Sequence, residues 1–359
     1  MQLQEALGKY REPYLGCDLV SAKVLQKCEQ SDDGQINLVL QLGFPAARYA
    51  EELKQNLTQY LQQTLSLEKK PHIEVQWKIV PHQVQQGQQG HPPIKNIIAV
   101  ASGKGGVGKS TVAVNLALAL QAEGARVGIL DADIYGPSQP WMLGVKQVPE
   151  AGNAPKKVLP VQSHGLYSMS IGYWVDNEQP MIWRGPMVSG ALGQLLNDTE
   201  WPELDYLVVD LPPGTGDIQL TMAQKIPVSG AVIVTTPQDL AVLDARKAYG
   251  MLQKVGITVL GVVENMSYYE CSQCGHHDAI FGSKGGEHMA EQYGIPLLGQ
   301  LPLNTLIREQ ADSGVPIVVA YPDSKLTQLY LAMARQVAAK LSLQPRNYGQ
   351  LFGEIKVTA

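Results

Sequence analysis

The N-terminal part of the chain carries two strand patterns, a helical pattern and a further strand pattern, in that order. Residues 20–28 and 36–42 alternate or run apolar as strands do, and the polar turn between them predicts a hairpin. Apolar residues recur every three or four positions over 48–65, which is typical of an amphipathic helix. Residues 73–80 alternate as a third strand. Together these elements predict a small α+β domain over residues 1–80.

The hydrophobic pattern stops at residues 81–94. This stretch is rich in Gln, Gly and Pro and has few side chains to bury. Such a composition is typical of a flexible linker. We therefore expect two domains that are joined by this segment.

From residue 95 to residue 359, strand patterns alternate with helical patterns. This alternation predicts an α/β fold, in which helices cover both faces of a mostly parallel sheet and ligands bind at the carboxyl ends of the strands. Residues 136–185 interrupt the alternation and are expected to form an irregular insertion with short strands. The expected strands are 96–101, 126–131, 206–210, 231–235, 258–263 and 297–301, and the expected helices are 111–123, 240–255, 286–293 and 325–341.

Composition and charge exclude several classes of protein. The 359 residues are 45% apolar and 17% charged, which is ordinary for a globular protein with a sizeable core. A formal net charge of −5 leaves no basic excess for a general nucleic-acid binder. We see no apolar run that predicts a signal peptide or a transmembrane helix. Four cysteines over this length do not suggest a disulfide framework, so we expect a reducing, cytoplasmic setting.

A glycine-rich motif lies between the first strand and the first helix of the second domain. It matches the pattern G-x-x-x-x-G-K-[ST]. In this context the loop forms a phosphate cradle, because backbone N–H groups point inward and the helix N-terminus is partly positive. We expect Lys109 to contact the β- and γ-phosphates of ATP and Ser110 to hold Mg²⁺. The predicted nucleotide-binding residues are Gly103, Lys104, Gly105, Gly106, Val107, Gly108, Lys109, Ser110 and Thr111.

A second lysine, Lys104, follows the first glycine of this motif directly. The pattern resembles the deviant Walker A ATPases, a class that includes MinD and ParA. The resemblance implies that Lys104 reaches across a dimer interface to the nucleotide of the partner chain, where a cation stabilises charge in the transition state. Lys104 and Lys109 are therefore the predicted catalytic lysines. The alternative for Lys104 is a solvated loop lysine.

Acidic residues end two of the predicted strands. Asp131 and Asp133 follow one strand and Asp210 ends another, so we expect them at the same sheet edge as the glycine-rich loop. Asp210 matches a Walker B carboxylate, which is directed at the magnesium hydration shell. The resemblance implies that Asp133, as a catalytic residue, orients or activates the attacking water and that Asp131 supports the magnesium shell. A helix cap is the simpler role for Asp at a strand end. Gly214 is expected to bring its N–H close to the γ-phosphate and so to sense hydrolysis.

Two further residues are candidates for binding the base. Asn265 follows the strand pattern at 258–263, and Pro302 follows the one at 297–301. Both match positions at which related ATPases hold the adenine ring. Asn and Pro are also common turn residues, which is the structural alternative.

Cys271 and Cys274 form a CxxC motif in a polar loop after Asn265. Polar flanks argue against a buried structural pair. The Gly-His-His that follows does not resemble the helix start that a thioredoxin-type redox pair requires. Zinc and an iron–sulfur cluster both accept four thiolates, which two chains could supply across a dimer. The motif alone does not separate these two metals.

The order of the motifs resembles one family, the Mrp/ApbC-type iron–sulfur cluster carriers. The resemblance implies a P-loop NTPase fold and a homodimer that binds ATP and Mg²⁺. It also implies one bridging [4Fe–4S] cluster, held by Cys271 and Cys274 of each chain. Slow ATP hydrolysis would then switch the transfer of the cluster to apo iron–sulfur proteins, with cluster assembly factors as further partners. The motifs are GKGGVGKST (103–111), DADIYGPS (131–138), WRGPM (183–187), DLPPGTGD (210–217), TTPQD (235–239), ENMS (264–267) and CSQCG (271–275).

The N-terminal unit resembles the small MIP18-like domain that is fused to many such carriers. Tyr14 stands where an acidic residue is more typical of that domain. Cys17 and Cys28 have no CxxC partner and are expected to pack in the core. The positions that match the usual opening of the domain are Pro13, Leu15, Asp18 and Val20.

Two alternative functions belong to other classes. One is a regulatory ATPase of the MinD/ParA kind, which partitions DNA or is positioned on a membrane. The tail at 345–359 is not a basic amphipathic helix, and no basic patch suggests DNA, so we expect neither a membrane nor a nucleic-acid partner. The other is a zinc-bridged dimer that serves as a scaffold.

Overall fold

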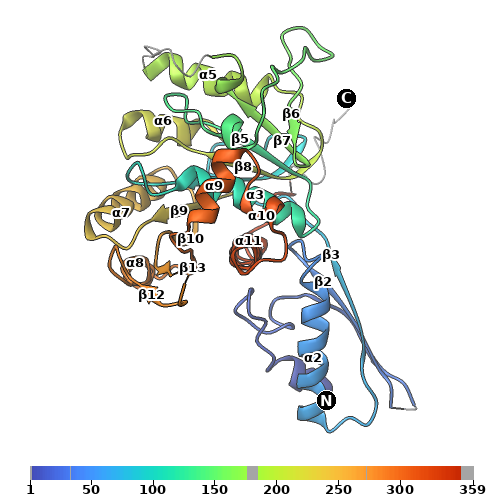
Figure 1. The fold of residues 1–359 in the computed structure, drawn as a ribbon. Helices are drawn as coiled ribbons and strands as arrows, with labels where there is room; N and C mark the ends of the chain where they lie inside the picture. Colours follow the sequence, from blue (N-terminus) through green and yellow to red (C-terminus); the bar gives the residue numbers. More distant parts are fainter. Residues whose placement is uncertain (1, 33, 176–184, 272, 349–359) are drawn as a thin grey trace, which may run out of the picture.

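The structure, a computed structural model, describes residues 2–32, 34–175, 185–271 and 273–348. A small N-terminal domain lies beside a larger α/β domain (Figure 1). The small domain contains α1 (Gln2–Leu7), β1 (Leu25–Gln30), β2 (Ile36–Leu42), α2 (Ala50–Leu65) and β3 (His72–Trp77).

The small domain is a three-stranded sheet covered by α2, as its sequence pattern predicts. β1 and β2 form the expected antiparallel hairpin, and β3 pairs parallel to β2 on its other side. Alternate residues of β2 are buried, and so are the α2 residues Leu53, Leu57 and Leu61, which repeat every four positions. The first strand begins at residue 25 instead of 20, because the Asp18 carboxylate accepts the N–H groups of Val20 and Ser21 in a turn.

The segment expected to be a flexible linker packs against the larger domain. His82 and Gln85 are 2% and 5% exposed. The Gln85 carboxamide donates to the carbonyl oxygens of Ala223 and Ile226 at the end of α6 (Asp217–Lys225). The last carbonyl groups of a helix have no partner within the helix, and the glutamine supplies one. The expectation of little burial is therefore wrong at these two positions.

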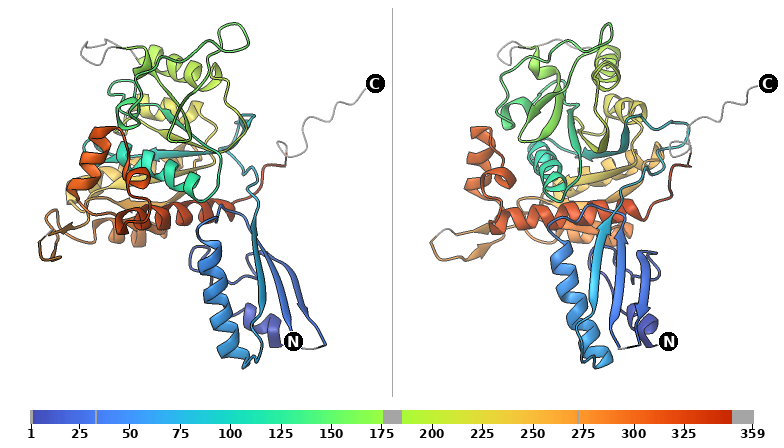
Figure 2. Two further views of the ribbon diagram at one scale, coloured as in Figure 1. Left: turned by 45° about the vertical axis from the view of Figure 1, so that its right-hand side comes forward. Right: turned by 90° about the vertical axis from the view of Figure 1, so that its right-hand side faces the viewer.

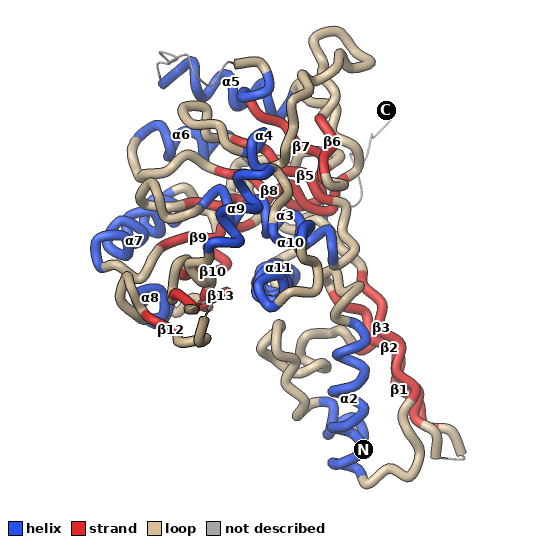
Figure 3. The backbone as a smooth tube through the Cα atoms, viewed as in Figure 1, coloured by secondary structure: helices blue, strands red, loops and turns tan. Residues whose placement is uncertain are grey.

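The larger domain has three layers, with helices on both sides of an eight-stranded sheet (Figure 3). Its expected strands and helices are confirmed to within two residues at each end. The sheet contains β4 (Ile94–Ala101), β5 (Val127–Asp131), β6 (Val161–Ser163), β7 (Leu166–Ser170), β8 (Leu204–Asp210), β9 (Gly230–Thr235), β10 (Val259–Glu264) and β13 (Leu297–Gln300). The helices other than α6 are α3 (Lys109–Ala122), α4 (Gln139–Met142), α5 (Gly185–Asn197), α7 (Asp239–Lys254), α8 (Gly285–Tyr293), α9 (Thr305–Ser313), α10 (Ile317–Ala320) and α11 (Lys325–Ser342).

The sheet has the order β13-β10-β9-β4-β8-β5-β7-β6, and only the β6–β7 pair is antiparallel. Side chains of β4 alternate between two apolar clusters: Ile98 and Val100 face α3 and α11, whereas Ile97 and Ala99 face α5 to α8. Both faces are thus buried. Asp131 of β5 and Asp210 of β8 are partners in register, so the parallel topology brings both to one edge of the sheet.

The insertion at residues 136–185 contributes short strands, as expected, and these join the main sheet. β7 pairs parallel to β5, and β6 closes that end of the sheet. Of the motif at 183–187, Trp183 and Arg184 lie outside the described residues. Within the described part of the chain, no helix is both long and apolar enough to cross a membrane.

The two domains share a junction built around α11, drawn in red in Figure 1. Arg335 of α11 is 6% exposed and donates from Nε to the Glu123 carboxylate at 2.7 Å. Glu123 lies at the end of α3, and its other oxygen accepts the N–H groups of Arg48 and Tyr49 in the small domain. The Arg335 guanidinium also lies 5.1 Å from the centre of the Tyr49 ring. One apolar cluster continues from the small domain into α3 and α11.

Candidate functional site

The glycine-rich loop lies between β4 and α3, as predicted from the sequence. Two of its glycines are required, because other segments of the chain lie too close for a side chain. A Cβ on Gly103 would lie 2.0 Å from the carbonyl oxygen of Asp244, and one on Gly108 would lie 2.2 Å from Asn265 Nδ2. Gly108 also has φ +80°, a left-handed conformation that favours glycine. The loop is therefore held in a fixed shape by the helix and turn beside it.

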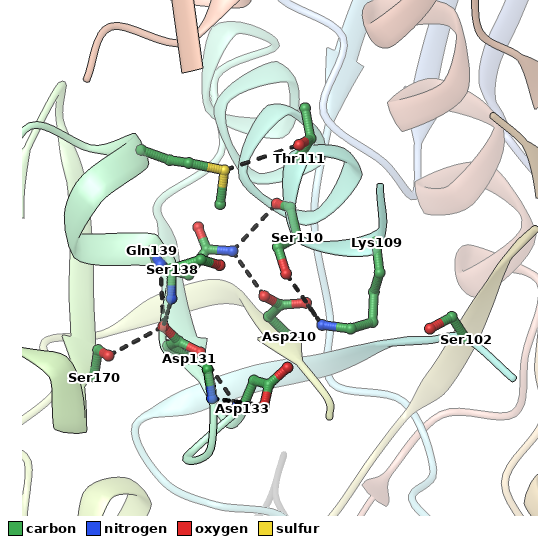
Figure 4. A network of polar contacts seen from close by, with 12 residues as sticks. Ser102, Lys109, Ser110, Thr111, Asp131, Asp133, Ser138, Gln139, Ser170 and Asp210 are labelled. Atoms are coloured by element: carbon green, nitrogen blue, oxygen red, sulfur yellow. Dashed lines mark hydrogen bonds and ion pairs between the residues drawn. The ribbon is translucent and has the colours of Figure 1, made fainter. Parts of the chain in front are cut away.

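Lys109, at the start of α3, forms a buried ion pair with Asp210 at the end of β8 (Figure 4). The two side chains are 5% and 0% exposed. The Lys109 ammonium also donates to Ser110 Oγ at 3.2 Å. Pairing offsets the cost of burying each charge. The three side chains that are predicted to bind phosphate or Mg²⁺, those of Lys109, Ser110 and Asp210, are therefore close together.

Gln139 connects the elements of this site and was not identified from the sequence. Its Nε2 donates to one Asp210 oxygen at 2.9 Å and to the carbonyl oxygen of Ser110 at 3.2 Å (Figure 4). Its backbone N–H donates to Asp131 at 3.0 Å. The only sequence signal was its place directly after the DADIYGPS motif.

Asp131 is fully buried, and its carboxylate accepts hydrogen bonds from the loop that follows it. The donors include the N–H groups of Asp133 and Ser138 and the hydroxyl of Ser170. Burial, together with the negative charge of Asp210, raises the pKa of Asp131 to about 7. Burial also raises the pKa of Asp133. Because three carboxylates share one lysine, this site is short of positive charge.

Lys104 is part of the glycine-rich loop, and Gly214 contacts the residue directly before that loop. The Lys104 side chain is exposed, in contrast to that of Lys109. Gly214 has φ +109°, and its N–H donates to the carbonyl oxygen of Ser102 at 3.0 Å. The amide that was predicted to approach a γ-phosphate thus touches the base of the glycine-rich loop.

A cavity of about 750 Å³ opens beside the loop. Its volume lies within the range of small-molecule sites. Asn265 and Pro302, the predicted base-binding residues, both line it, as does Thr111. Asn265 is tied to the loop, because its Nδ2 donates to the carbonyl oxygen of Val107 at 2.9 Å. Lining residues that the sequence did not indicate include Trp141, Ile307 and Arg308.

Cys271 and Cys274 lie on a hairpin formed by β11 (Tyr269–Glu270) and β12 (His277–Asp278), and Cys274 is exposed. Figure 2 shows the segment of this hairpin projecting from the larger domain. Hydrogen bonds from the backbone of Gln273 and Cys274 lower the pKa of the Cys271 thiol, which favours the thiolate that binds metals. Among the described residues, no cluster of three or more metal-binding side chains includes these cysteines.

The other two cysteines are in the small domain. Cys17 and Cys28 are half-buried and pack against its apolar core, as expected. Burial raises the pKa of both thiols, which disfavours the thiolate. Neither contributes to the site described above.

Comparison with protein families decides where this arrangement belongs. Residues 93–338 match the family described as NUBPL iron-transfer P-loop NTPase, and residues 1–75 match that of the iron-sulfur cluster assembly protein. The chain belongs to the NUBPL family of iron-transfer P-loop NTPases. The predicted resemblance to iron–sulfur carriers and the predicted P-loop fold are thereby confirmed.

Individual relatives of this family cover nearly the whole chain. An iron-sulfur cluster carrier protein of Haemophilus influenzae is 50% identical over 96% of this chain and 92% of its own length. The one from Escherichia coli is 49% identical over 94% and 91%. Among solved structures, a nucleotide-binding protein of Archaeoglobus fulgidus in complex with ADP is 36% identical, with a TM-score of 0.58, over 66% of this chain and 93% of its own.

Proposed function

We propose that the chain is an ATP-dependent carrier that binds an iron–sulfur cluster as cargo and transfers it to apoproteins. The observation that carries the proposal is a direct structural connection. Asn265, which is hydrogen-bonded to the glycine-rich loop, lies six residues before Cys271 on a continuous turn and hairpin. The names of the relatives, iron-sulfur cluster carrier proteins, support the same cargo.

ATP fits the cradle described above. The glycine-rich loop and the start of α3 would bind the phosphates, and the cavity beside Asn265 and Pro302 would take the base. Lys109 must then exchange Asp210 for a phosphate oxygen. Asp133 would orient the attacking water and accept its proton, a role that suits a carboxylate whose pKa burial raises.

Mg²⁺ fits the same place, because the site offers hard oxygen donors and an excess of negative charge. Ser110 Oγ and Asp210 would hold the ion, and Asp131 would support the loop around it. When bound, the ion would stabilise the charge of the transferred phosphoryl group. Gln139 keeps the Asp210 carboxylate oriented toward Ser110.

The cargo requires a second chain. Two cysteines supply half of the four thiolates that a [4Fe–4S] cluster binds, and the described residues offer no further ligands beside them. A homodimer would provide the other two thiolates, and it would also bring Lys104 of each chain to the nucleotide of the other. An exposed, two-fold position suits a cluster that is passed on.

Metal analysis of protein purified without oxygen tests the cargo. We expect iron and labile sulfide, which the Cys271→Ala variant loses while it still binds nucleotide. Cys17→Ala is the matched control and should keep the chromophore. Zinc without sulfide would support a zinc-bridged dimer instead, and an unchanged cluster spectrum in Cys271→Ala would refute the assignment.

Mixing two inactive variants tests the role of Lys104 across the interface. Lys104→Ala chains keep Asp133, and Asp133→Asn chains keep Lys104, so a mixed dimer contains one complete site. We expect each variant alone to be inactive in ATP hydrolysis and an equal mixture to recover about a quarter of the parent activity. If Lys104 acts within its own chain, the mixture stays inactive.

A further inference from the structure

Glu264 is a buried carboxylate to which the proposed reaction gives no role. It ends β10 and is 0% exposed. Its oxygens accept hydrogen bonds from Ser267 Oγ at 2.5 Å, from Gln300 Nε2 at 3.0 Å and from the N–H of Gly286 at 2.6 Å. These donors are all neutral, and they come from three separate segments of the chain. The carboxylate therefore joins the turn after β10 to the end of β13 and to α8.

The start of α8 is shaped to accept this carboxylate. A Cβ on Gly286 would lie 2.9 Å from the Cβ of Glu264, so only glycine allows this close approach. The first N–H groups of a helix lack partners within the helix and carry partial positive charge. The N–H groups at the start of α8 can therefore stabilise the buried Glu264 carboxylate, a role that a lysine or arginine often has.

The turn that Glu264 supports contacts the nucleotide loop. Asn265 donates to the carbonyl oxygen of Val107, and Met266 lines the cavity beside Gly108. Met266 has φ +54°, a backbone conformation that residues other than glycine rarely adopt. Such a turn persists only when its surroundings hold it, and the Ser267–Glu264 hydrogen bond closes it.

The same segment continues without a gap to the cysteines. The carbonyl oxygen of Tyr268 accepts the N–H of Leu303 at 2.7 Å. The Tyr268 ring stacks on that of His277, with 4.5 Å between ring centres. The N–H of Cys271 donates to the carbonyl oxygen of His276 at 2.9 Å. Every step from the glycine-rich loop to Cys271 is therefore a packed or hydrogen-bonded contact.

We infer that Glu264 is a positioning residue that fixes the turn between the glycine-rich loop and the cysteine hairpin, and that nucleotide binding alters the accessibility of Cys271 and Cys274 through it. The inference rests on the proposed function, because it assigns the regulation of the same two sites. Glu264 itself touches neither the nucleotide cavity nor the cargo. Its effect is on the response of one site to the other.

Alkylation of the cluster-free, full-length chain tests this inference. Iodoacetamide labelling is followed by mass spectrometry with and without saturating Mg-ADP, and Cys17 and Cys28 serve as internal references. In the parent chain, we expect Mg-ADP to change the labelling rates of Cys271 and Cys274 by about fivefold or more, a typical size for coupling between sites. The two reference cysteines should not respond.

Glu264→Gln should abolish this response while Mg-ADP still binds. A glutamine offers one acceptor and one donor group, so at least one of the three donors loses its partner. Glu287→Gln is the matched control, since it makes the same charge change on a partly exposed position of α8 and should respond like the parent. Ser267→Ala removes a single donor and should weaken the response, which provides a test even if Glu264→Gln does not fold.

Two results would overturn the inference. In the first, Mg-ADP does not change the labelling rates of Cys271 and Cys274 in the parent chain. In the second, Mg-ADP changes these rates in Glu264→Gln and Ser267→Ala as much as in the parent. Neither depends on the cargo. Failure to bind iron and sulfide would refute the carrier function and leave this measurement intact.

Discussion

Replacing Lys109 should reduce stability as well as activity, which distinguishes it from Lys104. In Lys109→Ala, the Asp210 carboxylate stays fully buried and loses its cation. Removing one partner of a buried ion pair costs about 3 kcal/mol. For a chain of this size, about 2 °C of melting temperature corresponds to each kcal/mol, so Lys109→Ala should melt about 6 °C below the parent. The exposed Lys104 has no such effect, and Lys104→Ala should melt within about 1 °C of the parent.

A double-mutant cycle measured by thermal and urea unfolding checks this reasoning. Asp210→Asn alone leaves Lys109 buried without its partner, whereas the double variant removes both charges. The double variant should therefore lose less stability than the two single variants combined. Equal melting temperatures for Lys109→Ala and Lys104→Ala, or strictly additive losses in the cycle, would refute it. ATP hydrolysis measured on Lys109→Ala then reports catalysis only at temperatures where the variant is folded.

The remaining predictions concern pH and loop shape. The folded-state pKa of Asp131, about 7, lies above its ordinary value of 3.8, so the folded chain binds the extra proton and its stability falls as pH rises between these values. In urea unfolding, the stability of the parent relative to Asp131→Asn should decrease from about pH 5 to about pH 7 and level off above; a constant difference would contradict the shift. Gly103→Ala should lower the melting temperature of the nucleotide-free chain, because its Cβ would meet Asp244, whereas Gly105→Ala, whose nearest neighbour would be 3.9 Å away, should not. Equal effects of the two substitutions would show that the loop relaxes around Gly103.

The sequence predicts well which residues lie at the carboxyl edge of the sheet, because in a parallel sheet the strands all end at that edge. Asp131 and Asp210 each end an apolar run, and β5 and β8 are neighbours, so the two carboxylates meet. The ion pair between Lys109 and Asp210 could not be predicted in the same way. A lysine in this motif indicates a phosphate, and only the packed structure shows that Asp210 is within its reach.

Buried polar residues whose hydrogen-bond partners lie far away in the chain could not be identified from the sequence. Gln139 and Gln85 are polar residues of a type that is usually exposed, and only the tertiary structure shows that both are buried and hydrogen-bonded. Glu264 belongs to a family motif, but its partners Gly286 and Gln300 come from later segments. Periodicity describes one element at a time and cannot pair such residues across the chain.

The junction at α11 has a consequence for how the protein is made. The small domain leaves the ribosome before the larger one, yet it packs against α11, which is the last helix of the described chain. Arg335 reaches Glu123, and the Lys340 ammonium donates to the carbonyl oxygen of Leu15 at 3.2 Å. During synthesis the small domain therefore carries uncovered apolar surface until α11 has emerged, a period in which chaperones can bind it. Both domains therefore depend on the same late helix for part of their cores.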